Sequence, residues 1–111
     1  MNIWKKLGVI FSVDCNSDWM HSHASIPVAD IIENNVTRIY FGTRDRDNIS
    51  RIGYIDVKSD FPSEIIGISE KSLIPLGRLG TFDDNGIMPS WIVNNNGLRY
   101  LYYIGWNLQK K

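Results

Sequence analysis

The sequence predicts an all-β fold, and three observations support this. Runs rich in β-branched and aromatic residues recur along the chain, and polar or glycine-containing turns separate them. No long stretch has the apolar spacing of an amphipathic helix. The best helical candidate, residues 28–33, is short and ends at an asparagine pair, which is a turn signal. About six strands are therefore expected.

The predicted strands follow one another closely. Residues 38–42 and 50–57 form an antiparallel hairpin around a polar turn. Residues 65–68 continue toward 73–76 as an outer edge strand, where a proline is tolerated. A glycine-rich loop over residues 77–86 follows, and then the pattern restarts. Strands over 87–93 and 98–106 are joined by an Asn-Gly turn, which is the strongest hairpin signal in the chain.

The two halves of the chain resemble each other. Residues 34–41 return as residues 95–102, and each copy is a polar turn, an arginine and an aromatic strand. Repeats of this size are typical of stacked units such as the blades of a β-propeller. We therefore expect one four-stranded blade over residues 22–76 and part of a second over 84–107, in a single partial domain spanning 1–111. Since a propeller needs about four blades to close, most of it would lie outside this chain.

Composition excludes several classes of function. The hydrophobic fraction is 43% and the aromatic fraction 12%, which predicts an ordered chain. Twelve basic and twelve acidic residues balance, so neither a nucleic acid nor an anionic membrane is an expected partner. The lone Cys15 cannot form an internal disulfide. No signal peptide or membrane-spanning stretch is evident, so a cytoplasmic location is expected.

The repeat also selects candidate functional residues. In the alignment that places Asn34 opposite Asn95, His23 corresponds to Asp84 and Asp45 corresponds to Trp106. Loops that enter the innermost strands of a propeller gather at one mouth of the central channel. A histidine and a carboxylate that converge there can perform acid–base chemistry or bind sugar hydroxyls. This alignment favours Asp84 over its neighbour Asp83 as the channel carboxylate.

Several motifs together resemble a known family. They are the W-x-x-S-H-A-x-x-P pattern at residues 19–27, residues 38–45, residues 80–90 and residues 102–107. In combination they are similar to the N-terminal part of glycosidase-like five-bladed β-propellers, the superfamily of glycoside hydrolase families 43, 32, 62 and 68. The resemblance spans residues 8–107. It implies an incomplete five-bladed propeller with a carbohydrate site in a funnel at its axis.

The resemblance assigns roles to residues, with departures. It implies catalytic roles for Asp84, Asp83 and His23, although His23 stands where such enzymes usually carry an aspartate. The general acid of a later blade has no counterpart, because Glu33, Glu64 and Glu70 lie at a turn or in the outer-strand region. Substrate binding is assigned to four residues: Arg44, Asp45, Trp19 and Trp106.

Each candidate also has a purely structural interpretation. His23 can satisfy backbone groups at a strand end, and Asp83 and Asp84 can form an Asx turn. Arg44 and Asp45 can belong to a solvated hairpin loop with weak ion pairs. The two tryptophans can be packing residues rather than sugar platforms. A metal site at Asp18, His21 and His23 is not predicted, since it lacks a firm third ligand, and no cofactor is expected.

Three functional hypotheses follow. The first is a glycoside hydrolase-like protein, or its N-terminal part, acting on a glycan at the propeller axis by carboxylate chemistry. The second is a non-catalytic carbohydrate-binding propeller, and the third is a truncated product without independent activity. Enzymatic activity of the 111-residue chain itself is not expected. A partial propeller leaves one blade face uncovered, so self-association through that face is predicted.

Overall fold

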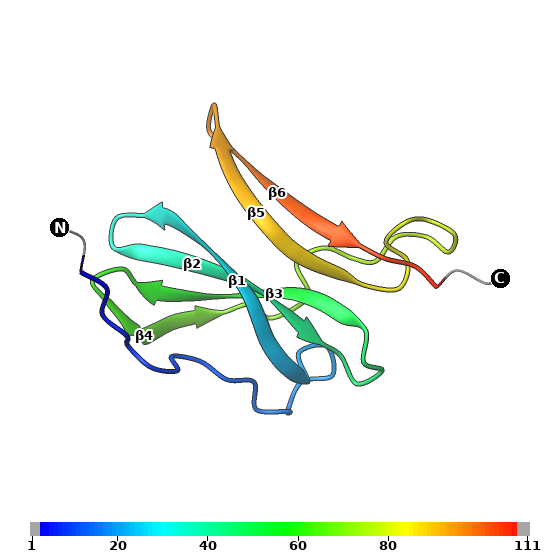
Figure 1. Cartoon of the computed structure of the whole chain (residues 1–111), viewed down its shortest axis with the longest axis horizontal. Coiled ribbons are helices and arrows are strands. Elements are labelled where there is room, and N and C mark those ends of the chain that lie inside the picture. Colours follow the sequence, from blue (N-terminus) through cyan, green and yellow to red (C-terminus); the bar gives the residue numbers. More distant parts are fainter. Residues whose placement is uncertain (1–2, 109–111) are drawn as a thin grey trace.

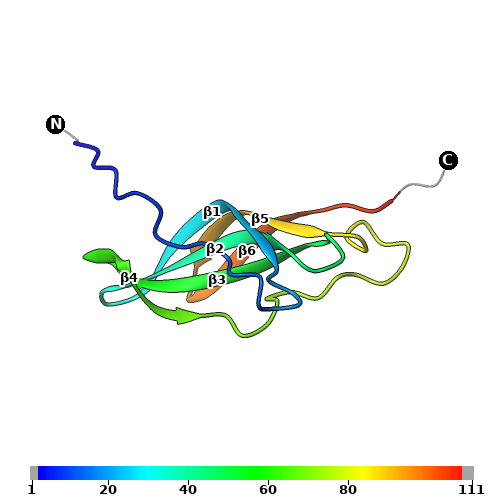
Figure 2. The ribbon, with the colours of Figure 1, turned by 90° about the horizontal axis from the view of Figure 1, so that it is seen from below.

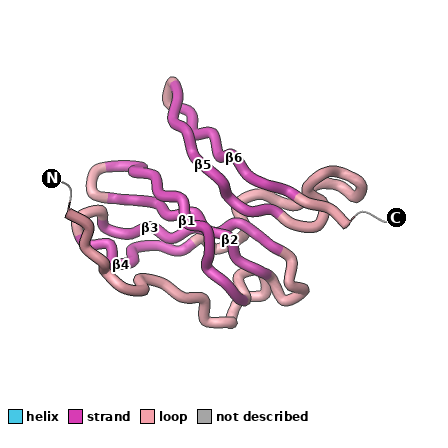
Figure 3. The backbone as a smooth tube through the Cα atoms, viewed as in Figure 1, coloured by secondary structure: helices cyan, strands magenta, loops and turns pink. Residues whose placement is uncertain are grey.

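The computed structural model describes residues 3–108 and contains strands but no helix in that range (Figures 1 and 3). The all-β prediction is therefore confirmed. No helix of the described part is long and apolar enough to cross a bilayer. The strands are β1 (Ser22–Glu33), β2 (Val36–Arg44), β3 (Ser50–Lys58), β4 (Phe61–Ile68), β5 (Ile87–Asn95) and β6 (Leu98–Gly105).

The strands form two antiparallel sheets. The first has the order β1-β2-β3-β4, so each strand pairs with its neighbour in sequence, and the second is the hairpin β5-β6. The first sheet has the four strands expected for residues 22–76, and whether the two sheets are propeller blades stays a prediction. The described residues form no ring of blades, and the two sheets are the whole architecture of this range.

The short helical candidate at residues 28–33 is a strand instead, since this segment is the second half of β1. Val28 and Asp30 are buried while Ala29 and Ile31 are more exposed, which is the alternation of a strand with one covered face. Pairing with β2, from Val28 opposite Tyr40 onward, overrides the weak local helical signal.

The outer strand is shorter than predicted, because β4 ends at Ile68 and residues 73–76 form no strand. The chain still follows β3 for a few residues. The amide of Ser69 donates to the carbonyl of Tyr54 at 2.9 Å, and the amide of Leu73 donates to that of Ile52 at 2.9 Å. This irregular segment carries the chain back toward the hairpin.

Both faces of the first sheet have a packing layer, and the layer opposite the hairpin leaves Ala24, Pro27 and Ala29 of β1 exposed. On one face, Phe41, Ile55 and Val57 pack with Met20, and the N-terminal residues join this cluster; the Phe11 and Phe41 ring centroids are 5.5 Å apart. On the other face lies the hairpin, with β5 in contact with β1, β2 and β3. Figure 2 shows the N-terminal segment and the C-terminal segment leaving at opposite ends of this assembly.

The structure corrects the register of the repeat. The pairs that close the two turns are Glu33 with Val36 and Asn95 with Leu98, so Glu33, not Asn34, corresponds to Asn95. A shift of one residue turns every side chain to the opposite face of its sheet. Trp106 therefore corresponds to Arg44 rather than to Asp45.

The corrected register also separates the pair that the repeat had aligned. His23 lies inside β1, whereas Asp84 lies in the turn before β5. These two residues therefore do not occupy equivalent positions in their sheets, and the expectation that the repeat brings them to one channel mouth loses its basis.

Candidate functional site

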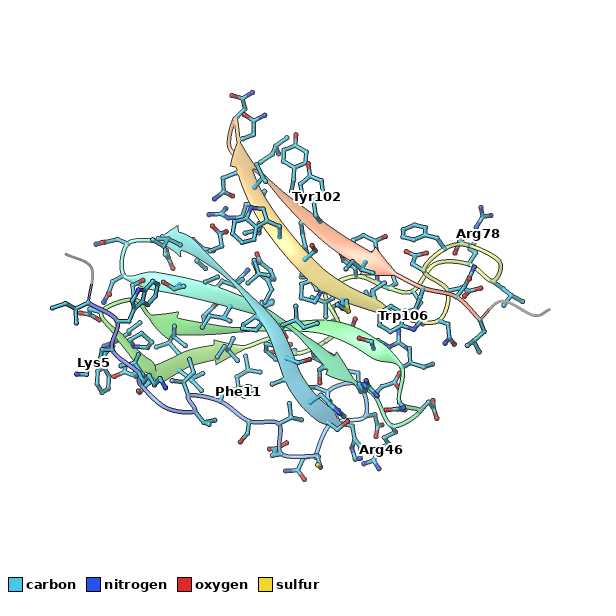
Figure 4. The ribbon with its side chains drawn as sticks, in the orientation of Figure 1. Lys5, Phe11, Arg46, Arg78, Tyr102 and Trp106 are labelled. Atoms are coloured by element: carbon cyan, nitrogen blue, oxygen red, sulfur yellow. The ribbon has the colours of Figure 1, made fainter. Side chains whose placement is uncertain are left out.

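The predicted site residues lie at one end of the molecule, in two groups. One group surrounds the start of β1 and the β2–β3 loop, and the other surrounds the loop before β5 and the end of β6. Figure 4 shows Arg46, next to the first group, and Trp106 of the second at this end. Within residues 3–108, no hydrogen bond or ion pair joins Trp19, His23, Arg44 or Asp45 to the second group, which comprises Asp83, Asp84 and Trp106.

Asp45 holds the loop between β2 and β3. Its buried carboxylate accepts hydrogen bonds from the amides of Asp47 and Ile49, both at 2.9 Å, and from Nε of Arg51 at 3.1 Å. A carboxylate bonded to amides further along the chain forms an Asx turn. The neighbouring Arg44 is exposed, and its Nη1 donates to Oδ1 of Asn48 at 3.0 Å. The hydrogen-bonding capacity of the Asp45 carboxylate is therefore used within the β2–β3 loop and by Arg51 of β3.

Trp19 forms one wall of an open depression beside this loop. Its indole Nε1 donates to the carbonyl of Glu70 at 3.0 Å, and its ring lies over Gly53, where an added Cβ would be 3.1 Å from the ring. These contacts hold the indole in place. The depression has a volume of about 410 Å³ and is lined by Asp18, Trp19, Asp45, Arg46 and Asp47. Arg46 forms an exposed ion pair with Asp18.

His23 is exposed and has a positive φ of 65° in the irregular start of β1. Its Nδ1 lies 2.8 Å from Oγ of Ser22. The nearby His21 has a buried Nδ1 without a hydrogen-bond partner in the structure. No cluster of three potential metal ligands occurs within residues 3–108. His23 is thus accessible, but none of its hydrogen bonds in this range joins it to a carboxylate.

The two aspartates of the second group are held inside their loop. Asp83 is buried and accepts hydrogen bonds from the Tyr103 hydroxyl at 2.8 Å and from Oγ1 of Thr81 at 3.1 Å. The bond to Asp83 raises the pKa of the Tyr103 phenol, because it stabilises the protonated form. Asp84 accepts from the amide of Gly80 at 2.7 Å. Each carboxylate therefore stabilises the loop that leads into β5.

Trp106 follows β6 and packs against this loop. A Cβ added to Gly86 would lie 2.6 Å from the indole ring, so only glycine allows the ring to approach so closely. The Trp106 amide donates to the Gly86 carbonyl at 3.1 Å, and the Trp106 carbonyl accepts from the amide of Asn85 at 3.0 Å. The ring remains partly exposed, and the residue continues the line of β6.

A third polar cluster, which the sequence did not reveal, joins the two sheets. The buried carboxylate of Asp30 on β1 accepts from Nε of Arg99 at 2.7 Å and from Nδ2 of Asn94 at 2.9 Å. Arg99 also donates to the carbonyl of Ile32 at 3.3 Å. These bonds fasten the hairpin to β1.

The other arginine of the repeat lies on the same face of the first sheet. Arg38 binds Asp56 with two hydrogen bonds of 2.8 and 2.9 Å, and its guanidinium lies 3.9 Å from the centroid of the Tyr54 ring. The bond to Asp56 raises the pKa of Arg38. Burial raises the pKa of the neighbouring Tyr40, against the opposing effect of the Arg38 charge. Both arginines bind an aspartate, but the Arg38–Asp56 pair lies within the first sheet and the Arg99–Asp30 pair joins the two sheets.

Comparison with known proteins identifies relatives but no family. The chain is 42% identical over 105 residues to two uncharacterized proteins of Mycobacterium tuberculosis, Rv1502 of strain ATCC 25618 / H37Rv and MT1551 of strain CDC 1551 / Oshkosh. The match covers 95% of this chain and 35% of each relative, so the chain spans about a third of their length. No family model matches the sequence. No solved structure matches it.

These findings correct the family assignment. The sequence motifs resembled glycosidase-like five-bladed β-propellers, but the matched relatives are uncharacterized and no glycosidase family is among the matches. The described residues form sheets of four and two strands without closure into a propeller. Within the motifs at residues 19–27 and 80–90, Trp19, Asp83 and Asp84 make hydrogen bonds to neighbouring segments, and the roles assigned to these residues stay predictions.

Proposed function

We propose that the first sheet binds a carbohydrate, without hydrolysing it, in the depression beside its β2–β3 loop. The observation that supports this is the depression in which the Trp19 ring lies beside Asp18, Arg46 and Asp47. An indole offers an apolar face against which a sugar ring can stack. Carboxylates accept hydrogen bonds from sugar hydroxyls, and a guanidinium donates to them. The depression therefore combines the groups that a sugar ligand requires.

Binding is preferred to hydrolysis because the candidate catalytic carboxylates are engaged. Glycoside hydrolysis usually needs two carboxyl groups that flank the scissile bond. Asp83 and Asp45 are buried and bonded within their loops, and Asp84 is bonded to Gly80. Hydrolysis through Asp84, Asp83 and His23 stays a prediction, as does the cytoplasmic location.

We further infer that the two sheets are successive units of one blade-type repeat. The turn after Glu33 corresponds to the turn after Asn95, and the first two strands of each unit are paired in the same order. The matched relatives are long enough to carry additional units, since the match covers only 35% of each. This supports a propeller-type arrangement in which each unit packs on the next.

The carbohydrate proposal is tested by titrating the full chain with a panel of soluble oligosaccharides and measuring heat by calorimetry. Arg46→Gln and Asp47→Asn each remove a charged group from the depression while leaving Trp19 and the strands in place. We expect each to weaken binding at least about tenfold, because a hydrogen bond to a charged group is worth about 1.5–3 kcal/mol. Trp19→Phe is a weaker test, since this ring also packs on Gly53.

The matched control is Glu64→Gln. Glu64 forms an exposed ion pair with Lys58 at 3.0 Å, at the opposite end of the same sheet. Its substitution should leave sugar binding unchanged. Absence of binding to every oligosaccharide would refute the proposal, and so would equal affinities for all the variants.

A further inference from the structure

The hairpin has an apolar face that points away from the first sheet. From Tyr100 to Gly105 the odd-numbered residues of β6 are half-buried and the even-numbered residues are exposed. Figure 4 shows Tyr102 on this outer side. We call this surface the outer face of the hairpin; its members, between 39% and 64% exposed, are Trp91, Val93, Leu98, Tyr100, Tyr102 and Ile104.

The outer face carries no charge. Among the residues of β5 and β6 the only charged side chain is Arg99, and its guanidinium is turned inward to Asp30. Contiguous apolar surface of this kind usually marks an interaction site. An uncharged face also presents no electrostatic obstacle to contact with an identical face. The whole chain has a formal net charge of zero, so two copies do not repel each other strongly.

The register of the repeat indicates which kind of element packs on the outer face. With Glu33 aligned to Asn95, Tyr100 and Tyr102 correspond to Arg38 and Tyr40. The face of the first sheet that carries Arg38 and Tyr40 is the one on which the hairpin packs. The outer face is therefore the equivalent acceptor surface of the second sheet, and its expected occupant is another pair of strands.

Within a second copy, the other sheet surface that could receive a pair of strands is already partly occupied. The N-terminal segment lies on the opposite face of the first sheet, with Phe11 against Phe41 and with Trp19 and Met20 beside them, and leaves an open apolar pocket of about 400 Å³ next to β1. Head-to-tail stacking of copies would have to displace this segment. We propose that the outer face instead packs on the outer face of a second copy, which gives a two-fold symmetric dimer.

The area of the outer face is sufficient for such a dimer. Fully covered aromatic side chains bury about 150–250 Å² each, so three half-exposed aromatic and three half-exposed aliphatic residues supply on the order of 600 Å² per copy. Two copies would then bury about 1,200 Å² in total, which reaches the lower end of specific interfaces. Two sheets packed face to face lie about 10 Å apart, a spacing that these side chains fill.

The test is sedimentation of the full chain over a range of concentrations. We expect a reversible shift from 12.8 kDa to twice that mass. Ile104→Lys should raise the dimer dissociation constant at least tenfold, because the two-fold axis brings a lysine from each copy into the same apolar contact. Tyr102→Lys should act in the same way. Added salt should not weaken the wild-type dimer, since no ion pair holds it together.

The matched control is Ile66→Lys on β4. Ile66 and Ile104 are both 48% exposed, but Ile66 lies on the first sheet and outside the outer face. It should leave the dimer intact, and circular dichroism should show the same β content in all the variants. A wild-type chain that stays monomeric at millimolar concentration would overturn the proposal and leave the outer face to a further unit of a longer chain. Equal effects of Ile104→Lys and Ile66→Lys would also overturn it.

Discussion

The two sheets begin with the same hairpin pattern but differ in how much of it they bury. In the first sheet, β2 has a strand on each side and a layer on each face, so Tyr40, Phe41 and Thr43 are all buried. In the second sheet, β6 pairs only with β5, and every second side chain is exposed. Burial here depends on the number of neighbours rather than on the strand sequence, because a two-stranded hairpin has too little core of its own.

The sheet edges differ in the same way. The edge strand β4 contains Pro62 and also Glu64, which forms an ion pair with Lys58 of β3. The other edge strand, β1, is interrupted by bulges between Ser22 and Val28. Prolines, charges and bulges prevent unwanted strand pairing. Within Leu98–Gly105, β6 has no proline, and its one charged residue, Arg99, is turned inward to Asp30. The edges of the first sheet are thus protected against further strand pairing, whereas the edge of β6 remains able to pair with another strand.

The largest expected effect is the difference in lost stability between an isoleucine-to-alanine substitution in the first sheet and one in the hairpin. Ile52 on β3 is fully buried, so Ile52→Ala should lower the free energy of unfolding by about 2–5 kcal/mol. Ile104→Ala on β6 removes the same atoms from a half-exposed position and should cost less than about 1 kcal/mol in the monomer. Urea denaturation at low protein concentration measures both. Similar losses in the two variants would mean that the hairpin is buried as deeply as the first sheet.

An intermediate effect concerns the link between the sheets. Asp30→Asn removes the charge that binds Arg99, so we expect a loss of about 1–3 kcal/mol. Hydrogen exchange should accelerate in β5 and β6 more than in β2 and β3, because the hairpin loses its attachment.

Asp18→Asn is the control for this link, since it breaks the exposed pair with Arg46 and should change stability by less than about 0.5 kcal/mol. Uniform acceleration of exchange in Asp30→Asn would show that the two sheets unfold as one unit.

The smallest expected effect appears at alkaline pH. Burial raises the pKa of Tyr40 above its ordinary value of 10.0, so the folded protein retains a proton that the unfolded chain has lost. This contribution to stability is complete below the unfolded pKa and is lost as the pH rises through the folded pKa. In a spectroscopic titration of phenol ionisation, Tyr40→Phe should remove a late-ionising group, and the urea-unfolded chain should lack that late step. An unchanged titration curve in Tyr40→Phe would contradict this assignment.

Local sequence patterns predicted most of the strands. The Asn-Gly turn and the aromatic runs located β2, β3, β5 and β6 within a few residues. The same patterns located the loops of the candidate site, because clusters of polar residues and glycines between strand-like runs mark loops. The short helical candidate at residues 28–33 is a strand, because pairing with β2 outweighs its weak helical signal.

The roles of the site residues could not be predicted in the same way. Asp45 and Asp83 have side chains suited to chemistry, but their hydrogen bonds to Ile49 and Tyr103 follow from the path of the loops. The link between Asp30 and Arg99 joins strands that are far apart in the sequence and depends on how the hairpin crosses the first sheet.

The sequence by itself determined that the chain is all-β and that a hairpin motif occurs twice, because turn residues and strand alternation are local properties. Only the tertiary structure decided the register of that repeat, in which Glu33 rather than Asn34 corresponds to Asn95, and with it the face on which each side chain lies. The physical reason is that side chains alternate between the two faces of a strand. A shift of one residue leaves the pattern recognisable but exchanges the buried face for the exposed one.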